Sequence, residues 1–337
     1  MKKLFIILIV LFGSSLVFSQ SDSLILKNGD VIIGEIKDMD RGVVTIETDY
    51  SDSDFKIEWD GITEMYTVTS FLISTSDGDR LNGTISTSGD KTIKVGLDEG
   101  GQKELNFTDI VYLKSVDDGF WNQVDAFVDI GLDMTKAKNL ATFSTRSGIN
   151  YMAPKWGLGL TFNTNFTTQD DVEDVNRTDG ALGFKYFLPN DFYIPVSVNY
   201  LRSTEQNLNS RWTVLAGAGY YVLHTNRLYW GFDAGGSFNN ENYMPDSIPD
   251  KQSFEGYFGT NLNLFDIGDF SLSTMARAFP SFTENGRWRV DFNLDTKYDL
   301  PLDFYIKIGF SLNYDNQPVA GGSDIDYTLH TGVGWEW

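Results

Sequence analysis

The fold of this chain is decided by the stretch Arg287-Trp288-Arg289-Val290-Asp291-Phe292-Asn293-Leu294-Asp295, in which polar and apolar residues alternate without a break. Successive side chains of a β-strand point to opposite faces, so this strand has one apolar face and one charged face. The same alternation returns in residues 304–312 and 325–337. A soluble sheet would keep its interior apolar, whereas an apolar outside around a charged inside is typical of a membrane barrel.

The alternation before and after this stretch predicts twelve strands whose connections are alternately tight and long. Short turns on one side, longer loops on the other and an even strand number are typical of bacterial outer-membrane barrels. The predicted strands are 121–134, 139–152, 156–168, 177–188, 191–203, 210–223, 226–239, 252–265, 269–280, 286–299, 302–314 and 324–337. The tight turns are 153–155, 189–190, 224–225, 266–268 and 300–301, and the longer loops include 169–176, 204–209, 240–251 and 315–323.

Aromatic residues cluster where these predicted strands meet turns or loops. Tyr and Trp favour the bilayer interface because their rings are apolar with a polar edge. Ordinary strand propensity is the alternative explanation, but the facing pattern favours aromatic girdles. The terminal Trp337 also fits an outer-membrane assembly signal. The girdle candidates are Tyr151, Trp156, Tyr186, Phe192, Tyr200, Trp212, Tyr298, Tyr314 and Trp335.

Residues 1–19 have the pattern of a secretory signal peptide. Lys2 and Lys3 precede an apolar run, and a small-residue site at Ser19 leaves Gln20 as the first mature residue. The apolar run is shorter than the ~20 residues that a spanning helix needs. The chain has no cysteine, which excludes disulfides, thiol chemistry and lipid attachment at a processed cysteine.

The charge of the chain excludes nucleic acid as a partner. Loss of Lys2 and Lys3 with the signal peptide takes the formal net charge from −21 to −23, whereas phosphate binding needs clustered Lys and Arg. Solubility of the loops and of an amino-terminal domain explains the acidity. The acidic run 170–174 is open to two interpretations: divalent cation binding near lipopolysaccharide, or a hydrated external loop, which we favour.

Residues 20–117 contain a repeat, at about 23–66 and 70–114. The segment 28–36 returns as 77–85, each with an Asn-Gly or Asp-Gly pair, which is a strong signal for a hairpin. The repeat predicts a small periplasmic all-β domain made of two Sm- or SH3-like units. Its acidic residues lie mostly at turns, which they stabilise, and no calcium-loop spacing is present. The domain is either a module that binds a periplasmic protein or the cell-wall polymer, or a spacer or plug for the barrel.

The glycine-aromatic pattern in residues 211–221, 229–236 and 326–334 resembles the salt-induced outer-membrane proteins, a bacterial family of unknown function. The resemblance covers about residues 121–337. It implies an outer-membrane β-barrel without an established molecular activity, and it supplies no catalytic residues. The repeated segment lies outside it.

The inward positions of the predicted strands carry charges of both signs. Such groups either line a narrow aqueous path that selects solutes by charge, or pair across the lumen and close it. Both interpretations stay open for a barrel of twelve strands. The candidate lumen-lining residues are Asp125, Asp129, Asp133, Arg146, Lys185, Arg211, Asp233, Glu255, Arg277, Arg289, Asp291, Asp295, Lys297, Lys307, Asp326, His330 and Glu336.

No enzyme is predicted, and neither catalytic residues, a cofactor nor a metal site is expected. The chain has only two histidines, and no serine elbow or metal-spaced His/Glu motif accompanies them. His224 falls in a tight turn. His330 shares a strand face with Asp326 and Thr328, a partial base-and-orienter arrangement for which a hydrogen-bonding role in the lumen is favoured over catalysis.

The sequence therefore predicts a barrel in the bacterial outer membrane, in contact with its lipid, with an amino-terminal periplasmic domain. The favoured function is an envelope structural protein or a narrow passive channel for small solutes. The alternatives are a binding or scaffold protein that acts through residues 21–117 and, as a minor hypothesis, an outer-membrane hydrolase.

Overall fold

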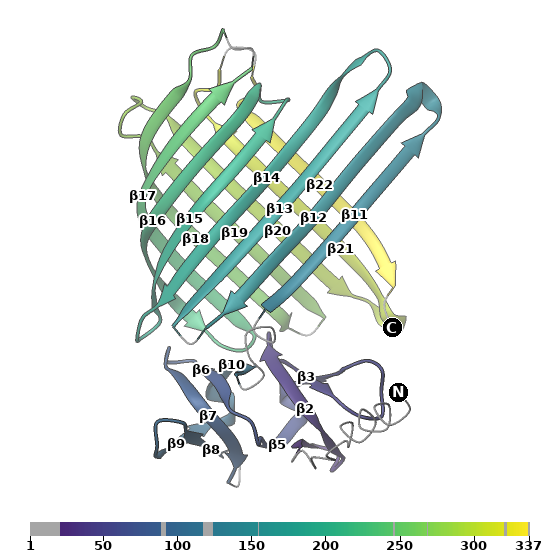
Figure 1. Cartoon of the computed structure of the whole chain (residues 1–337), viewed down its shortest axis with the longest axis vertical. Coiled ribbons are helices and arrows are strands. Elements are labelled where there is room, and N and C mark those ends of the chain that lie inside the picture. The colour runs from purple at the N-terminus through teal and green to yellow at the C-terminus, as the bar shows by residue number, and fades with distance from the viewer. Residues whose placement is uncertain are drawn as a thin grey trace, which may run out of the picture.

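A computed structural model describes residues 21–88, 92–116, 124–153, 155–244, 247–267, 269–319 and 322–335. The predicted signal peptide, Glu336 and Trp337 lie outside these residues. The described elements are β-strands and short 3-10 turns, arranged as a small ten-stranded sheet and a large twelve-stranded sheet. The small sheet forms an amino-terminal domain that lies beneath one end of the large one (Figure 1).

The amino-terminal domain repeats one order of elements: five strands with a 3-10 turn before the last. This agrees with the internal repeat, while its Sm or SH3 type stays a prediction. The first half contains β1 (Asp22–Leu26), β2 (Val31–Asp40), β3 (Val43–Glu47), β4 (Phe55–Glu58), η2 (Trp59–Gly61) and β5 (Ile62–Tyr66). The second contains β6 (Phe71–Thr75), β7 (Arg80–Thr87), β8 (Thr92–Leu97), β9 (Gln102–Asn106), η3 (Phe107–Asp109) and β10 (Ile110–Ser115).

Each half of the domain pairs with the other half through its last strand. The last strand of the first half, β5, pairs with β7, and the last strand of the second half, β10, pairs with β2. Apolar residues from strands of both halves point into a shared core, which includes Leu24, Ile36, Ile73 and Ile93. Because one core serves both halves, we treat residues 21–116 as a single folding unit.

The large sheet is an antiparallel meander in which each strand pairs with the next one in the sequence. Twelve strands were predicted, and the described residues of this sheet form twelve. They are β11 (Val124–Thr135), β12 (Leu140–Met152), β13 (Trp156–Gln169), β14 (Val172–Phe187), β15 (Phe192–Ser203), β16 (Leu208–His224), β17 (Leu228–Tyr243), β18 (Lys251–Ile267), β19 (Phe270–Pro280), β20 (Trp288–Asp299), β21 (Phe304–Asp315) and β22 (Ile325–Trp335). The 3-10 turns η5 (Ala137–Asn139) and η6 (Pro301–Asp303) lie in two of the connections.

The tight turns fall where they were predicted, but one predicted loop is wrong. Residues 169–176 were expected to form a long acidic loop, whereas β13 and β14 continue until Gln169 pairs with Val172. Only Asp170 and Asp171 are left for the turn, and Asp171 takes a positive φ of 62°. β14 is longer than predicted because residues 172–176 hydrogen-bond to β13. The alternation within residues 172–176 alone does not reveal this pairing. We call the end with the tight turns the turn side and the opposite end the loop side.

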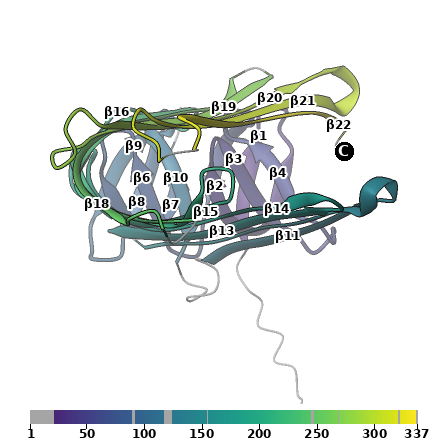
Figure 2. The same cartoon turned by 90° about the horizontal axis from the view of Figure 1, so that it is seen from above.

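The large sheet curves around a hollow interior, but closure into a barrel is not observed. Between the described residues of β11 and β22, the first and last strands, there is no ladder, and the sheet opens at this seam (Figure 2). The apolar side chains at the seam are more exposed than elsewhere: Ile130 is 70% and Val333 74% exposed, against 36% for Val196 of β15. The predicted strands are therefore present, but the predicted closure of the barrel is not observed.

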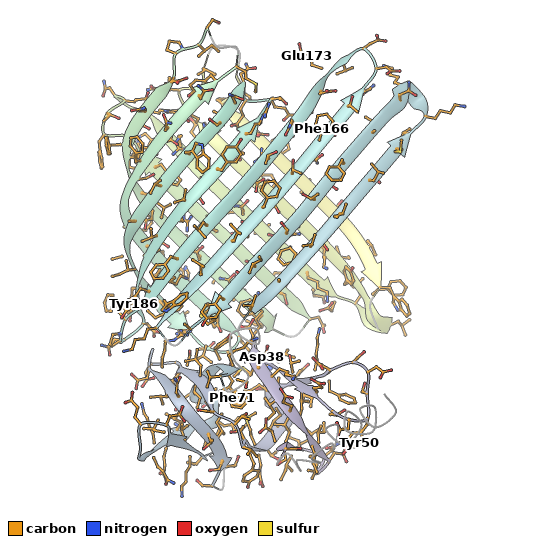
Figure 3. All side chains as sticks on the ribbon, in the orientation of Figure 1. Asp38, Tyr50, Phe71, Phe166, Glu173 and Tyr186 are labelled. Atoms are coloured by element: carbon orange, nitrogen blue, oxygen red, sulfur yellow. The ribbon has the colours of Figure 1, made fainter. Side chains whose placement is uncertain are left out.

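Exposed apolar side chains lie along much of the convex face of the large sheet, and Figure 3 labels Phe166 and Tyr186 toward its two ends. Leu160, Phe162 and Phe166 are among the exposed apolar side chains of β13 alone. Predicted girdle residues lie toward the two ends of the strands: Tyr200 packs on Trp212 at 4.9 Å near the loop side, and Tyr151 on Trp156 at 5.0 Å near the turn side, both measured between ring centroids. No helix within the described ranges is long and apolar enough to span a membrane.

Candidate functional site: the interior of the large sheet

The interior of the large sheet holds two cavities, one toward each end. The loop-side cavity has a volume of about 580 Å³ and is lined by polar residues of β12–β16 and β19–β21, including five arginines. The turn-side cavity has a volume of about 800 Å³ and is closed below by the amino-terminal domain. Arg277 lines both cavities.

A buried ion-pair network covers the loop side of the interior. The guanidinium of Arg287, which is 1% exposed, donates to Glu241 on β17 at 2.9 Å and to Asp315 on β21 at 2.5 Å. Arg287 also pairs with Glu284, and Arg211 donates to the same Glu241 at 2.6 Å. Burial disfavours the charged form of Arg287, but its hydrogen bonds to Asp315 and the negative charge of Glu241 outweigh this effect and raise the pKa of Arg287. The network ties β16, β17, β20 and β21 together across the opening.

Further pairs cross the interior below this network. Arg289 donates to both carboxylate oxygens of Glu255, at 3.1 and 2.6 Å, in the bidentate geometry that suits a guanidinium. Arg177 of β14 reaches the opposite wall, where it donates to Asp326 at 2.6 Å and to Asn313 at 3.0 Å. Most arginines of the loop-side cavity are therefore neutralised by carboxylates.

A small apolar cluster, which we call the waist, reaches both cavities: Leu215 lines the turn-side cavity and Phe279 the loop-side cavity. Leu215, Tyr257 and Phe279 are almost fully buried and pack on one another inside the sheet. Glycines make room for the rings: a Cβ at Gly217 would lie 2.4 Å from the Tyr257 hydroxyl, and one at Gly219 would lie 2.3 Å from the ring of Tyr193. The glycine-aromatic alternation of β16 thus allows tyrosines to lie flat across the inner face of the sheet.

The amino-terminal domain closes the turn side through the tight turns. Arg80 donates to the carbonyl of Ala153 at 3.3 Å, and its guanidinium lies 4.1 Å from the centre of the Phe187 ring. Asp60 pairs with Arg227 at 2.7 Å in the turn between β16 and β17. Arg41 lies over the ring of Phe265. These contacts come from β7, from η2 and from the turn between β2 and β3, in keeping with the position of the domain in Figure 1.

The predicted lumen-lining residues are distributed over several environments. Those that line a cavity are Arg146, Lys185, Arg211, Arg277, Arg289, Asp291 and Asp295. Asp233 and Glu255 are buried inside the sheet, and Asp326 pairs with Arg177. Lys297 and Lys307 both lie over the ring of Tyr305, while Asp129 and Asp133 are exposed on the edge strand β11. Asp125 and His330 belong to β11 and β22, and their side chains are outside the described part of the structure.

Three charged residues of the interior were not among the predicted lumen-lining residues. Glu241 lies beyond the predicted end of its strand at residue 239, and Arg177 stands at a predicted strand start beside the expected loop. Arg177 has the same parity as the inward Lys185, a signal that could have found it. Arg80 belongs to the amino-terminal repeat, and no local pattern shows that it enters the turn-side cavity.

Of the two histidines, only His224 has a described side chain. His224 Nδ1 lies 2.6 Å from an Asp191 carboxylate oxygen and stacks on Tyr221 at 5.0 Å, which places it in a turn-side hydrogen-bonded cluster. Groups of three or more His, Asp or Glu with the spacing of a metal site are absent from the described ranges.

Comparisons with known proteins concern the large sheet. The model of a family described as "Protein of unknown function, DUF481" matches residues 128–337. No curated protein matches. Solved structures with some similarity include a NanC porin in a rhombohedral crystal form, with 10% identity, a TM-score of 0.37 and coverage of 64% of this chain and 98% of that one. Another is a porin refined at 1.8 Å resolution, with 10% identity, a TM-score of 0.30 and coverage of 80% and 98%.

Proposed function

The chain belongs to DUF481, a family of proteins of unknown function, and on that premise we propose that it is an outer-membrane protein with a narrow, charge-lined passage. β11 and β22 pair in the membrane and complete a twelve-stranded barrel, because a bilayer offers no partner for an open sheet edge. The amino-terminal domain lies on the periplasmic side, since short turns mark that side of bacterial barrels.

The observation that carries this proposal is the pair of cavities in line within the sheet, which share Arg277 and meet at the waist. A structural barrel filled by its side chains would leave no such volumes. The apolar waist is the kind of constriction that controls conduction by dewetting. The buried network around Arg287 narrows the loop side, and the amino-terminal domain covers the turn side.

The test is the conductance of the folded, full-length mature protein in a planar bilayer. Discrete and reproducible steps with a small conductance support the passage. A silent bilayer, with folding verified by heat-dependent gel migration, contradicts it and leaves a structural role. Reversal potentials in asymmetric salt then report the selectivity that the interior charges impose.

A second candidate, binding through the amino-terminal domain, is favoured by an exposed apolar patch. Ser23 pairs with Ile33 on one side and Tyr66 on the other, so the three share one face of the sheet. Ile33 and Tyr66 are exposed there, together with Val31 and Val68. Co-sedimentation with isolated cell-wall sacculi, abolished by Ile33→Asp, supports this role, and co-sedimentation that is unchanged by the substitution argues against it.

A further inference from the structure

The turn-side cavity has a charge opposite to that of the protein. The chain has a formal net charge of −21, yet the cavity is lined by Arg41, Arg80, Lys185 and Arg277, with Asp40 as the acidic side chain of the lining. Asp40 is itself paired with Arg41, at 3.4 Å. A concave site of one sign, walled by protein of low dielectric constant, concentrates ions of the other sign.

The cations reach the cavity from three directions. Lys185 comes from β14 on one wall, Arg277 from β19 on the opposite wall, and Arg80 from the domain that forms the floor (Figures 1 and 2). Burial lowers the pKa of Arg80 to about 10, so it keeps its charge at neutral pH although it is largely removed from water. Convergent charges that are partly desolvated attract a counter-ion more strongly than exposed ones do.

Two of these cations have no carboxylate partner in the part of the chain that the structure describes. Lys185 donates to the hydroxyl of Tyr221 at 2.8 Å and lies 4.7 Å from the centre of the Tyr193 ring. The Nε of Arg277 is buried and makes no hydrogen bond. This contrasts with the loop-side cavity, where Arg177, Arg211 and Arg289 are paired with carboxylates.

The rest of the cavity lining includes aromatic residues and glycines. Tyr112, Tyr221 and Tyr229 line the cavity, and Gly157, Gly159 and Gly183 leave room on its β13–β14 wall beside Lys185. A volume of about 800 Å³ lies in the range of ~300–1,000 Å³ that is usual for small-molecule sites. Aromatic walls suit a flat or ring-shaped body, and a guanidinium suits a carboxylate.

We propose that the turn-side cavity binds a small organic carboxylate with a ring-shaped or otherwise flat apolar body. Lys185, Arg277 and Arg80 hold the carboxylate, and the tyrosines pack against the body. The site deepens the proposed function by naming a class of solute. This inference depends on the proposed function only for the route by which the carboxylate enters, because the cavity is present whether or not the protein conducts.

The test is isothermal titration of the full-length mature protein, folded in a non-ionic detergent at low salt, with protein-free micelles as the blank. The probes are benzoate, benzyl alcohol as its neutral counterpart, and inorganic phosphate as an anion without a ring. Benzoate is expected to bind at least tenfold more tightly than either of the others. Phosphate binding as tight as that of benzoate, or no benzoate binding, overturns the proposal.

Two variants locate the site. Lys185→Met removes a charge at nearly constant length and is expected to weaken benzoate binding at least tenfold. Gly183→Trp fills the cavity, since a Cβ at Gly183 would meet only the carbonyl oxygen of Gly159, at 4.0 Å, and it is expected to abolish binding. Lys94→Met, at an exposed lysine of the amino-terminal domain, is the matched control and should leave the affinity unchanged.

Heat-dependent gel migration establishes that each variant is folded. Folded variants that bind benzoate as the parent does overturn the assignment to this cavity. Binding without conductance contradicts the passage alone, and conductance without binding contradicts this site alone.

Discussion

Trp59 and Phe107, which occupy equivalent places in the two halves of the amino-terminal domain, stack on each other with 4.1 Å between ring centroids. The indole nitrogen of Trp59 also donates to the carbonyl of Phe107 at 3.0 Å. Each belongs to the 3-10 turn before the last strand of its half. The stack therefore lies where the two repeats meet, and it links their cores.

Trp59→Ala is expected to destabilise the whole amino-terminal domain and not its first half alone. Replacing a buried Trp by Ala costs about 3–5 kcal/mol, mainly through lost contacts and the cavity that is left. Limited proteolysis of the folded protein should release fragments from both halves while residues 124–335 stay protected. Tyr50→Ala, at a residue 79% exposed, is the control and should change nothing. Cleavage confined to residues 21–66 would contradict the shared core.

Arg287→Ala is expected to lower the stability of the large sheet by about 3–5 kcal/mol, because it leaves the buried carboxylate of Glu241 without one of its partners. The measurement is the temperature at which the folded gel band converts to the unfolded one. Lys155→Ala removes an exposed cation from a turn of the large sheet and should leave that temperature within error of the parent. Equal effects of the two changes would show that the network is not stabilising.

Leu215→Ala is expected to raise single-channel conductance several-fold, because it shortens a side chain of the apolar waist. Leu215→Met keeps the volume and serves as the control. A second control, Leu302→Ala, changes an exposed residue in a turn. If Leu215→Ala and Leu302→Ala both raise the single-channel conductance, the constriction lies elsewhere.

The seam between β11 and β22 can be tested with cysteines because the chain has none of its own. Ile130→Cys, combined in turn with Tyr327→Cys, Leu329→Cys and Val333→Cys, places thiols on the apolar faces of both edge strands. Closure of the barrel predicts that one combination forms an intramolecular disulfide in membranes, since the bond requires Cβ atoms about 3.5–4.5 Å apart. Cross-linking into a dimer of twice the mass would show that the edges pair with a second copy.

Acid is expected to loosen the turn at Asp77. The hydrogen bond from Thr75 holds the pKa of the Asp77 carboxyl below its usual value of 3.8. A pKa that is lower in the folded state contributes stability above about pH 4, and this contribution is lost as the pH falls through the folded value. Thr75→Val should therefore reduce the stability of the domain at pH 7 more than at pH 2.5, as measured by urea unfolding. A difference that does not depend on pH would contradict this linkage.

The strands and tight turns could be predicted because their signals are local. The alternation in residues 287–295 and the turn residues at 153–155 and 300–301 are visible without any knowledge of neighbouring strands. Strand ends were less visible, because ladder bonds to a partner extend β14 and β17 beyond their apolar alternation. This is why the turn at Asp170 was mistaken for a long loop.

The pairing of the interior charges could not be predicted for a related reason. Strand parity placed Arg211, Arg289 and Asp326 on the inner face, but not the partner of each. Arg177 and Asp326 are separated by 149 residues, and only the curvature of the sheet brings them together. Arg80 enters the turn-side cavity because the amino-terminal domain docks against the large sheet. Neither the internal repeat nor the strand alternation carries information about this docking.

The meander order of the large sheet has a consequence for the speed of its folding. Every ladder within it joins strands that follow one another, so each hairpin closes a short loop and loses little chain entropy. Such local pairings form early and can be added one at a time. The proposed closure of the seam would join the two ends of the sheet and add its one distant pairing. We therefore expect seam closure to be the slow, final step, during which the edges of β11 and β22 are available to the cell's assembly machinery.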